Sequence, residues 1–115
     1  MTRTMFTEAE HAFLAAPRGL ARVATVDSTG MPHVVPTGWS FDAASGDLLL
    51  TGRDVGSTQR VKHLRAQPRA AVVIDGVDDA RGWNPWALVV RGTACYDDTA
   101  DAIRVTPVSI ISWGI

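Results

Sequence analysis

Apolar runs divide the chain into six segments that are typical of β-strands. They cover residues 20–26, 31–41, 48–51, 70–74, 86–96 and 103–111. The first two flank the turn sequence 27–30, which predicts a hairpin. Pro32 and Pro36 lie inside the second segment, where proline cannot donate to a sheet ladder. We therefore expect an edge, a strand start or a bulge there, and a break at 36–38 that frees backbone groups for a ligand.

Two helices are expected among these strands. Thr7 and Glu10 have the spacing of a capping box, which predicts a short helix ending before Pro17. A second helix should begin with Ser57 as its N-cap and be stopped about three turns later by Pro68. No repeated βαβ pattern is present, so the order predicts a mainly β (α+β) fold. We expect one domain over residues 1–115, with an N-terminal helix in 1–17 and a six-stranded antiparallel split β-barrel with short helices in 20–115.

The later strands carry three further expectations. Residues 70–74 are apolar throughout, which predicts a strand that is buried on both faces. Residues 75–85 are rich in Asp and Gly and predict a polar loop. Cys95, the lone cysteine, follows an apolar strand pattern and is expected to be a core residue, not a nucleophile. It cannot form an internal disulfide, which fits a reducing cytoplasm.

Composition and motifs narrow the classes of function. The net charge is −1, so no overall basic field argues for a nucleic-acid partner. No run approaches the ~18 apolar residues of a membrane span. The chain starts without an apolar signal region, so we expect a cytoplasmic protein without a membrane partner. The three His lack metal-ligand spacing and no nucleophile motif is present, so we expect no metal site and no catalytic side chain. A cofactor should then supply the reactivity.

Residues 51–69 hold an unusual concentration of positive charge. Five of the eleven Lys and Arg lie there, against a single acid, Asp54. Arg60 and Lys62 stand near the expected helix start, where the helix dipole disfavours cations. An anion bound to the free amides of the first turn would offset that cost. The segment therefore predicts a phosphate-binding site, with a solvated basic helix face as the alternative.

Several stretches resemble the pyridoxamine 5'-phosphate oxidase-like superfamily, whose fold is a split β-barrel. Residues 20–36, LARVATVDSTGMPHVVP, resemble its first hairpin. The similarity continues through residues 57–69, STQRVKHLRAQPR, and residues 89–94, VVRGTA. The ending at 103–115, IRVTPVSIISWGI, is similar to the actinobacterial branch that uses the deazaflavin coenzyme F420. The resemblance runs from about residue 20 to the last residue.

The resemblance implies an F420-dependent oxidoreductase that transfers hydride between the cofactor and a small organic substrate. It also implies a homodimer with two cofactor sites at the subunit interface. The implied phosphate-binding segment contains Arg60 as the basic ligand, with polar neighbours. The implied cofactor-binding residues are Val35, Pro36, Thr37, Gly38, Thr51, Gly52, Ser57, Thr58, Gln59, Arg60, Lys62 and His63.

Three alternatives stay open at this point. Arg60 stands where the family often has Lys, and His63 where it often has Asn, so FMN is the alternative cofactor. The second alternative is a non-catalytic flavin or deazaflavin carrier that uses the same site. The third, a haem-using relative, is a weaker alternative because no His stands out as an axial ligand. Trp83, Trp86 and Trp113 offer more aromatic surface than a small core needs. We expect some of them at the dimer interface, or else packed within one subunit.

Overall fold

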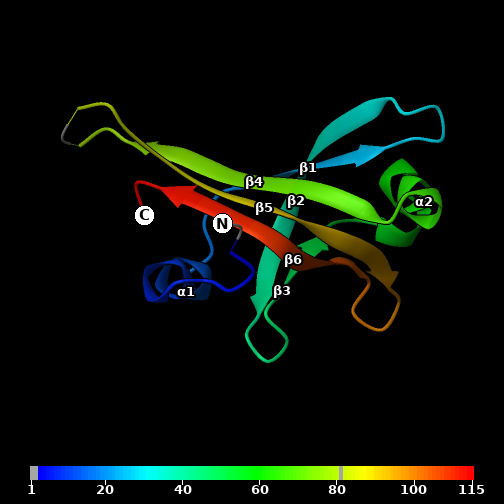
Figure 1. Cartoon of the computed structure of the whole chain (residues 1–115), viewed down its shortest axis with the longest axis horizontal. Helices are drawn as coiled ribbons and strands as arrows, with labels where there is room; N and C mark the ends of the chain where they lie inside the picture. The colour runs from blue at the N-terminus through cyan, green and yellow to red at the C-terminus, as the bar shows by residue number, and fades with distance from the viewer. Residues whose placement is uncertain (1–2, 81) are drawn as a thin grey trace.

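Antiparallel strands close into a six-stranded barrel, as Figure 1 shows. The computed structural model describes residues 3–80 and 82–115, and in these residues the strands follow one another around the ring in the order β1-β2-β3-β6-β5-β4. The strands are β1 (Ala21–Val26), β2 (Pro32–Asp42), β3 (Asp47–Thr51), β4 (Arg69–Asp78), β5 (Asn84–Asp97) and β6 (Ala102–Trp113). The helices are α1 (Glu8–Ala15), α2 (Gln59–Ala66) and the short 3-10 helix η1 (Val55–Ser57). The expected antiparallel barrel is confirmed.

The barrel interior is filled by every second residue of each strand. Along β4, Ala70, Val72 and Ile74 are buried, whereas Ala71 and Val73 are only half-buried. The expectation that 70–74 is buried on both faces is therefore wrong for this chain. A strand in a closed barrel turns one face to the core and the other outward, so an apolar run leaves an apolar outer face.

Strand β2 is continuous and changes its partner part-way along. Residues 32–37 pair with β1, and the pairing with β3 begins at Gly38, which lies opposite Thr51. The expected break at 36–38 is thus wrong, although Pro32 does begin the strand. Pro36 is accommodated because β2 has only β1 beside it at that point, which leaves its other edge free of a ladder.

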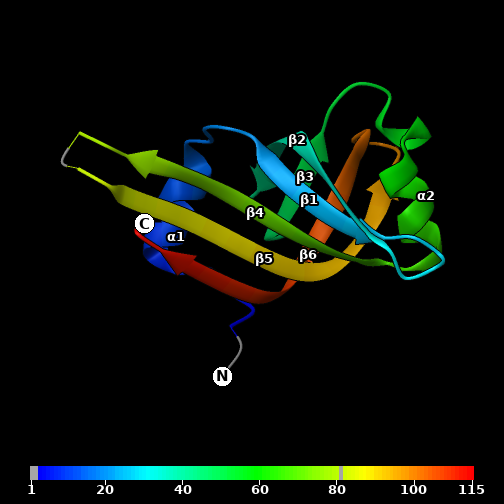
Figure 2. The same cartoon turned by 90° about the horizontal axis from the view of Figure 1, so that it is seen from above.

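The segment 75–85 is not the polar loop expected from its sequence. Strands β4 and β5 continue through it as a twisted ribbon, paired as far as Asp78 and Asn84. β1 pairs with β4 only up to Ile74, and β6 pairs with β5 only from Ala87. The ribbon therefore projects from the barrel as an arm, here defined as residues 77–85, whose residue 81 lies outside the described residues. Figure 2 shows the arm at one end of the molecule and α2 at the other.

Cys95 lies on the opposite side of the sheet from the one expected, and Trp86 takes the second of the two places expected for it, packed within its own subunit. Cys95 is exposed on the outer face, because β5 alternates without interruption and puts Cys95 on the same face as Arg91 and Thr93. Trp86 is 8 % exposed and packs on Phe13 in the core, so it is not available to an interface. Gly92 lets the strands approach, since a Cβ there would lie 2.0 Å from the Thr106 carbonyl oxygen.

Helix α1 closes one end of the barrel. Its predicted capping box is confirmed, because Thr7 Oγ1 accepts from the Glu10 amide and the Glu10 carboxylate accepts from the Thr7 amide. Glu10 is also bound by both terminal guanidinium nitrogens of Arg3 and by the hydroxyl of Ser112. Among the described residues, no helix has the length and apolar character needed to cross a membrane.

Candidate cofactor-binding site

Helix α2 is held against the barrel by a few apolar anchors. Val55, Val61 and Leu64 are buried, and the helix packs on β1 and β5. The N-cap is Thr58, not Ser57, which is an exposed residue of η1. The Thr58 hydroxyl donates to the Val55 carbonyl (2.7 Å) instead of capping α2, so no side chain caps the helix. The first-turn amides of α2 have no acceptor within the helix, which leaves them for solvent or a ligand.

Arg60, the second residue of α2, turns its guanidinium toward the end of β3. Its Nη2 lies 3.5 Å from the place where a Cβ on Gly52 would stand. Its Nε is buried and, among the described residues, has no hydrogen-bond partner. A buried donor left unbonded costs free energy, so this atom is expected to meet an acceptor that is not part of the chain. The residues present therefore fit an anionic cofactor group.

The β1–β2 hairpin supplies the wall facing α2. Thr25 Oγ1 and His63 Nδ1 are 2.8 Å apart, and the His63 ring lies against the His33 ring with centroids 4.6 Å apart. His33 Nε2 is in turn 2.8 Å from Asp27 Oδ2. Hydrogen bonds from the Thr29 side chain and from His33, together with backbone amides, hold the pKa of Asp27 well below its usual value. Asp27 therefore presents a carboxylate that orients the His33 ring.

Two adjoining hollows lie between the hairpin and α2, and together we call them the hairpin–helix site. The smaller, of about 100 Å³, contacts Arg60, and the larger, of about 440 Å³, contacts Lys62. His33, Gln59 and His63 line both. The remaining lining residues are Thr25 and Val35 for the smaller hollow, and Asp27, Ser28 and Ala66 for the larger.

The structure brings together only part of the predicted residue set. Gln59, Arg60, Lys62, His63 and Val35 line the hairpin–helix site. The other predicted residues adjoin the site or serve the fold. Ser57 and Pro36 are exposed, and Thr58 bonds to Val55. Thr37 is buried and donates to the Thr51 carbonyl (2.6 Å), and Gly38 fits beside the Thr51 hydroxyl because a Cβ there would come within 2.7 Å of it. Gly52 forms the surface facing Arg60.

Thr25, Asp27 and His33 were missed by the sequence reasoning. A signal for two of them was available, because the predicted hairpin around 27–30 places Thr25 directly opposite His33, as the register shows. What the sequence does not show is that α2 lies across this hairpin and brings His63 to both residues. Among the described residues, no group of three His, Cys, Asp or Glu side chains lies close enough to hold a metal ion.

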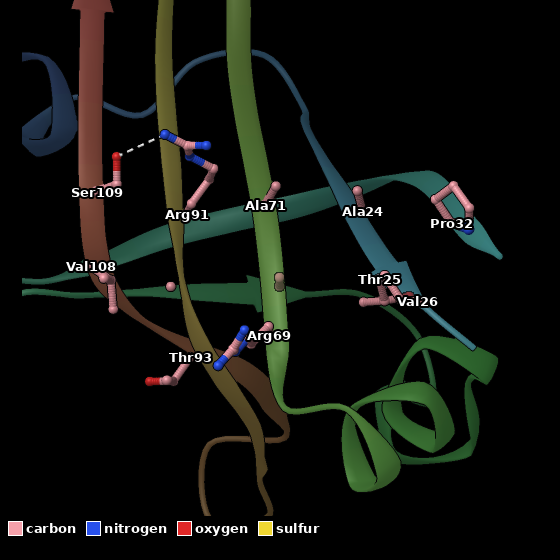
Figure 3. Close-up of a pocket in the computed structure, with 12 residues that line it drawn as sticks. Ala24, Thr25, Val26, Pro32, Arg69, Ala71, Arg91, Thr93, Val108 and Ser109 are labelled. Carbon is pink, nitrogen blue, oxygen red and sulfur yellow. Dashed lines mark hydrogen bonds between the residues drawn. The ribbon is translucent and has the colours of Figure 1, made fainter. Parts of the chain in front are cut away.

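A larger hollow lies on the outer face of the barrel, across β1, β4, β5 and β6 (Figure 3). Its volume is about 560 Å³, and its lining is mostly apolar. We call it the outer hollow; it is lined by Ala24, Thr25, Val26, Pro32, Arg69, Ala70, Ala71, Arg91, Gly92, Thr93, Val108 and Ser109. Arg91 Nη2 donates to Ser109 Oγ (3.2 Å) beside it. Thr25 is shared with the hairpin–helix site, so the two sites adjoin.

The family model for pyridoxamine 5'-phosphate oxidase matches residues 6–108 of this chain. The chain belongs to the pyridoxamine 5'-phosphate oxidase family. It is 33 % identical over 123 residues to the 5a,11a-dehydrotetracycline/5a,11a-dehydrooxytetracycline reductase of Streptomyces rimosus subsp. rimosus, a match covering 96 % of this chain and 84 % of that protein. The resemblance identified in the sequence is thereby confirmed at the level of the family.

Solved structures share the fold at lower identity. An FAD-binding protein from Mycobacterium smegmatis superposes with a TM-score of 0.64 at 22 % identity, covering 96 % of this chain and 97 % of that one. A protein described as an F420 reductase superposes with a TM-score of 0.58 at 19 % identity, covering 80 % of this chain and 88 % of that one. At these identities the likeness concerns the barrel itself.

Proposed function

We propose that this protein is an oxidoreductase that binds the deazaflavin F420 and transfers hydride between it and a small, mostly apolar organic substrate. The observation that carries the proposal is the buried, unpartnered Nε of Arg60 at the start of α2. The relative named as a reductase supports the class of reaction, and the structural neighbour described as an F420 reductase supports the cofactor. FMN is the alternative, because an FAD-binding protein has the same fold.

Arg60 and the first-turn amides of α2 would hold the cofactor phosphate. Guanidinium–phosphate hydrogen bonds are charge-assisted and short, and the positive end of the helix dipole adds to them. Gly52 supports this role, since its lack of a side chain leaves space for the guanidinium. Lys62 and the His33–His63 pair would face the polar part of the cofactor in the larger hollow.

The free edge of β2 at Val35 and Pro36 would lie along the flat ring. When bound, F420 supplies the hydride-transferring carbon, so the chain itself needs no nucleophile. The task of the protein is then to orient the ring and the substrate at a separation of about 3–3.5 Å and to exclude water. Thr37 and Gly38 fix the position of this edge, because Thr37 ties β2 to the Thr51 carbonyl.

We propose further that the protein acts as a homodimer. The outer face of the sheet carries half-buried or exposed apolar side chains, among them Val73, Val89, Val108 and Ile111. Contiguous apolar surface of this kind is typical of a protein–protein interface. A two-fold dimer would cover it with the same surface of a second copy.

The test is a titration of the purified protein with F420, FMN and FAD, followed by Trp fluorescence. We expect F420 to bind most tightly, and Arg60→Ala to weaken that binding. Turnover is then measured as the change in F420 absorbance with quinones, enones and 5a,11a-dehydrotetracycline as acceptors. Tight FMN binding without F420 binding would reject the cofactor. F420 binding without turnover on any acceptor would favour a carrier.

A further inference from the structure

The arm is an apolar and acidic projection that the rest of its own chain does not cover. Trp83 at its end is 77 % exposed and Val77 is 42 % exposed. Residues 77–85 contain two Asp, Asp78 and Asp79, against one Arg in sequence. A two-stranded ribbon is marginal in water by itself, so a projecting ribbon that carries a bare Trp is expected to lie against another surface.

The outer hollow (Figure 3) has the opposite character, and the residues of β4 and β5 that line it lie toward the end of these strands that is remote from the arm. Small residues, Ala24, Ala71 and Gly92, form its floor, which leaves room for a flat ring. Arg69 and Arg91 stand at its rim, and the described residues that line it include no carboxylate. The hollow therefore matches the arm in character, because it offers an apolar surface to the apolar side chains of the arm and two arginines to its carboxylates.

We propose that the arm of each subunit docks against the outer hollow of a second copy, with Val77 and Pro85 over Arg69 and Thr93 at its rim and with Trp83 beside Cys95. This inference rests on the homodimer of the proposed function and specifies its geometry. Arm and hollow cannot meet within one chain, because they occupy opposite ends of one continuous sheet. Two copies related by a two-fold axis can exchange them symmetrically.

The strand register shows where that axis would pass. Val73 and Val89 are paired, both face outward, and they stand midway between the arm and the outer hollow. The paired residues Val77 and Pro85 lie toward the arm, and the paired residues Arg69 and Thr93 lie toward the outer hollow. Both pairs are the same number of residues along the strands from Val73 and Val89. A two-fold axis that lies over the Val73–Val89 pair, parallel to the sheet and across the strands, therefore lays the arm of one copy over Arg69 and Thr93 of the other.

This exchange would make each cofactor site depend on both subunits. Thr25 lines the outer hollow and also the small hollow that contacts Arg60. An arm seated in the outer hollow thus forms an outer wall beside the partner's hairpin–helix site. The arm thereby becomes a positioning element for that site, supplied from the second copy.

Disulfide trapping tests the proposal without any cofactor. Cys95 lies two residues beyond Thr93 on the outer face and is exposed. We expect Trp83→Cys to form a disulfide with Cys95 of the partner subunit, seen as a covalent dimer on a non-reducing gel. The same bond within one chain is excluded, because twelve residues of extended strand span about 40 Å and a disulfide needs Cα atoms within about 7 Å.

Four further variants complete the experiment. Trp83→Cys with Cys95→Ser should remove the cross-link, and adding Thr93→Cys to that double variant should restore it. Ala44→Cys, on the exposed β2–β3 turn, is the matched control and should not cross-link. Trp83→Ala should raise the dimer dissociation constant at least about tenfold, the scale expected when a Trp side chain buried in an interface is truncated.

The outcomes separate this inference from the proposed function. The exchange is overturned, and the homodimer kept, if light scattering shows a dimer but the other two results are negative. These are a cross-link from Cys95 or Thr93→Cys no stronger than that of the Ala44→Cys control, and an unchanged dissociation constant for Trp83→Ala. A monomer at micromolar concentration overturns both. Cross-linking without F420 binding keeps the exchange and rejects the cofactor.

Discussion

The two eight-residue helices, α1 and α2, differ in how their polar groups are bonded. In α1, Thr7 caps the first turn, and Glu10, which is 1 % exposed, accepts from Arg3, Ser112 and the Thr7 amide. In α2, no side chain caps the first turn, and the buried Nε of Arg60 has no partner among the described residues. The polar groups at the start of α1 are hydrogen-bonded within the chain, whereas those at the start of α2 remain available to a ligand.

The difference indicates what each helix is for. A buried charge whose hydrogen bonds are all made within the chain stabilises the fold and has little left to offer a ligand. A buried donor without a partner lowers stability until something binds it. We therefore assign α1 to the fold and α2 to binding, and the predictions below test that assignment from the largest expected effect to the smallest.

Glu10→Ala should lower the free energy of unfolding by about 3 kcal/mol, the lower end of the range for breaking a buried ion pair. The lower end is expected because Arg3 is 40 % exposed and can be rehydrated. Urea denaturation measures the effect. Glu8→Ala, at an exposed position of the same first turn, is the control and should cost only a few tenths of a kcal/mol. A similar loss from both variants would refute the special role of Glu10.

Arg60→Ala should weaken cofactor binding by about 1.5–3 kcal/mol, the scale of hydrogen bonds to charged groups. Its stability should stay the same or rise, since an unbonded buried donor is removed. Lys62→Ala should have a smaller effect, and Arg65→Ala, toward the other end of α2, should have almost none. Fluorescence titration with F420 measures all three. Equal losses would mean that α2 offers a diffuse basic surface and no defined site.

Stability should fall in acid because of Glu10. Burial by itself raises the pKa of Glu10, but hydrogen bonds from Arg3, Ser112 and Thr7 outweigh it and hold the pKa at about 2, against an ordinary value of 4.5. A lowered folded-state pKa gives stability that is full above the unfolded-state value and is lost as the pH falls toward 2. We expect a loss of roughly 2 kcal/mol over this window, allowing for solvent screening at Arg3.

Glu10→Gln is the matched variant for that measurement, because it keeps the size of the side chain but cannot titrate. Between pH 5 and pH 2, the unfolding free energy of Glu10→Gln should therefore fall by roughly 2 kcal/mol less than that of the unaltered protein. Identical pH profiles for the variant and the unaltered protein would show that Glu10 is not the group responsible.

Thr7→Ala should cost about 1 kcal/mol of stability, the usual value of an N-cap hydroxyl. Thr58→Ala should cost less, because the Thr58 hydroxyl bonds to the Val55 carbonyl and not to an amide of α2. Thermal or urea denaturation compares the two, with Thr7→Ser and Thr58→Ser as conservative controls. A larger loss from Thr58→Ala would contradict the view that α2 is uncapped.

The sequence by itself determined most of the local structure. The capping box at Thr7 and Glu10, the hairpin around 27–30 and the alternation of apolar residues are signals within a few positions of each other, so they predict elements directly. The charge of residues 51–69 likewise predicted an anion site that includes Arg60, and the buried, unpartnered Nε supports that prediction over a solvated basic face.

The tertiary structure decided what lies beyond such local signals. Cys95 lies outside because the barrel closes with the Leu88, Val90 and Ala94 face of β5 inward. Whether 75–85 is a loop or a ribbon depends on pairing between two strands that its polar composition does not reveal. The meeting of His33 and His63 joins residues on different elements, brought together only when α2 folds across the β1–β2 hairpin. Contacts between distant segments depend on how the whole barrel closes, and local propensity cannot specify them.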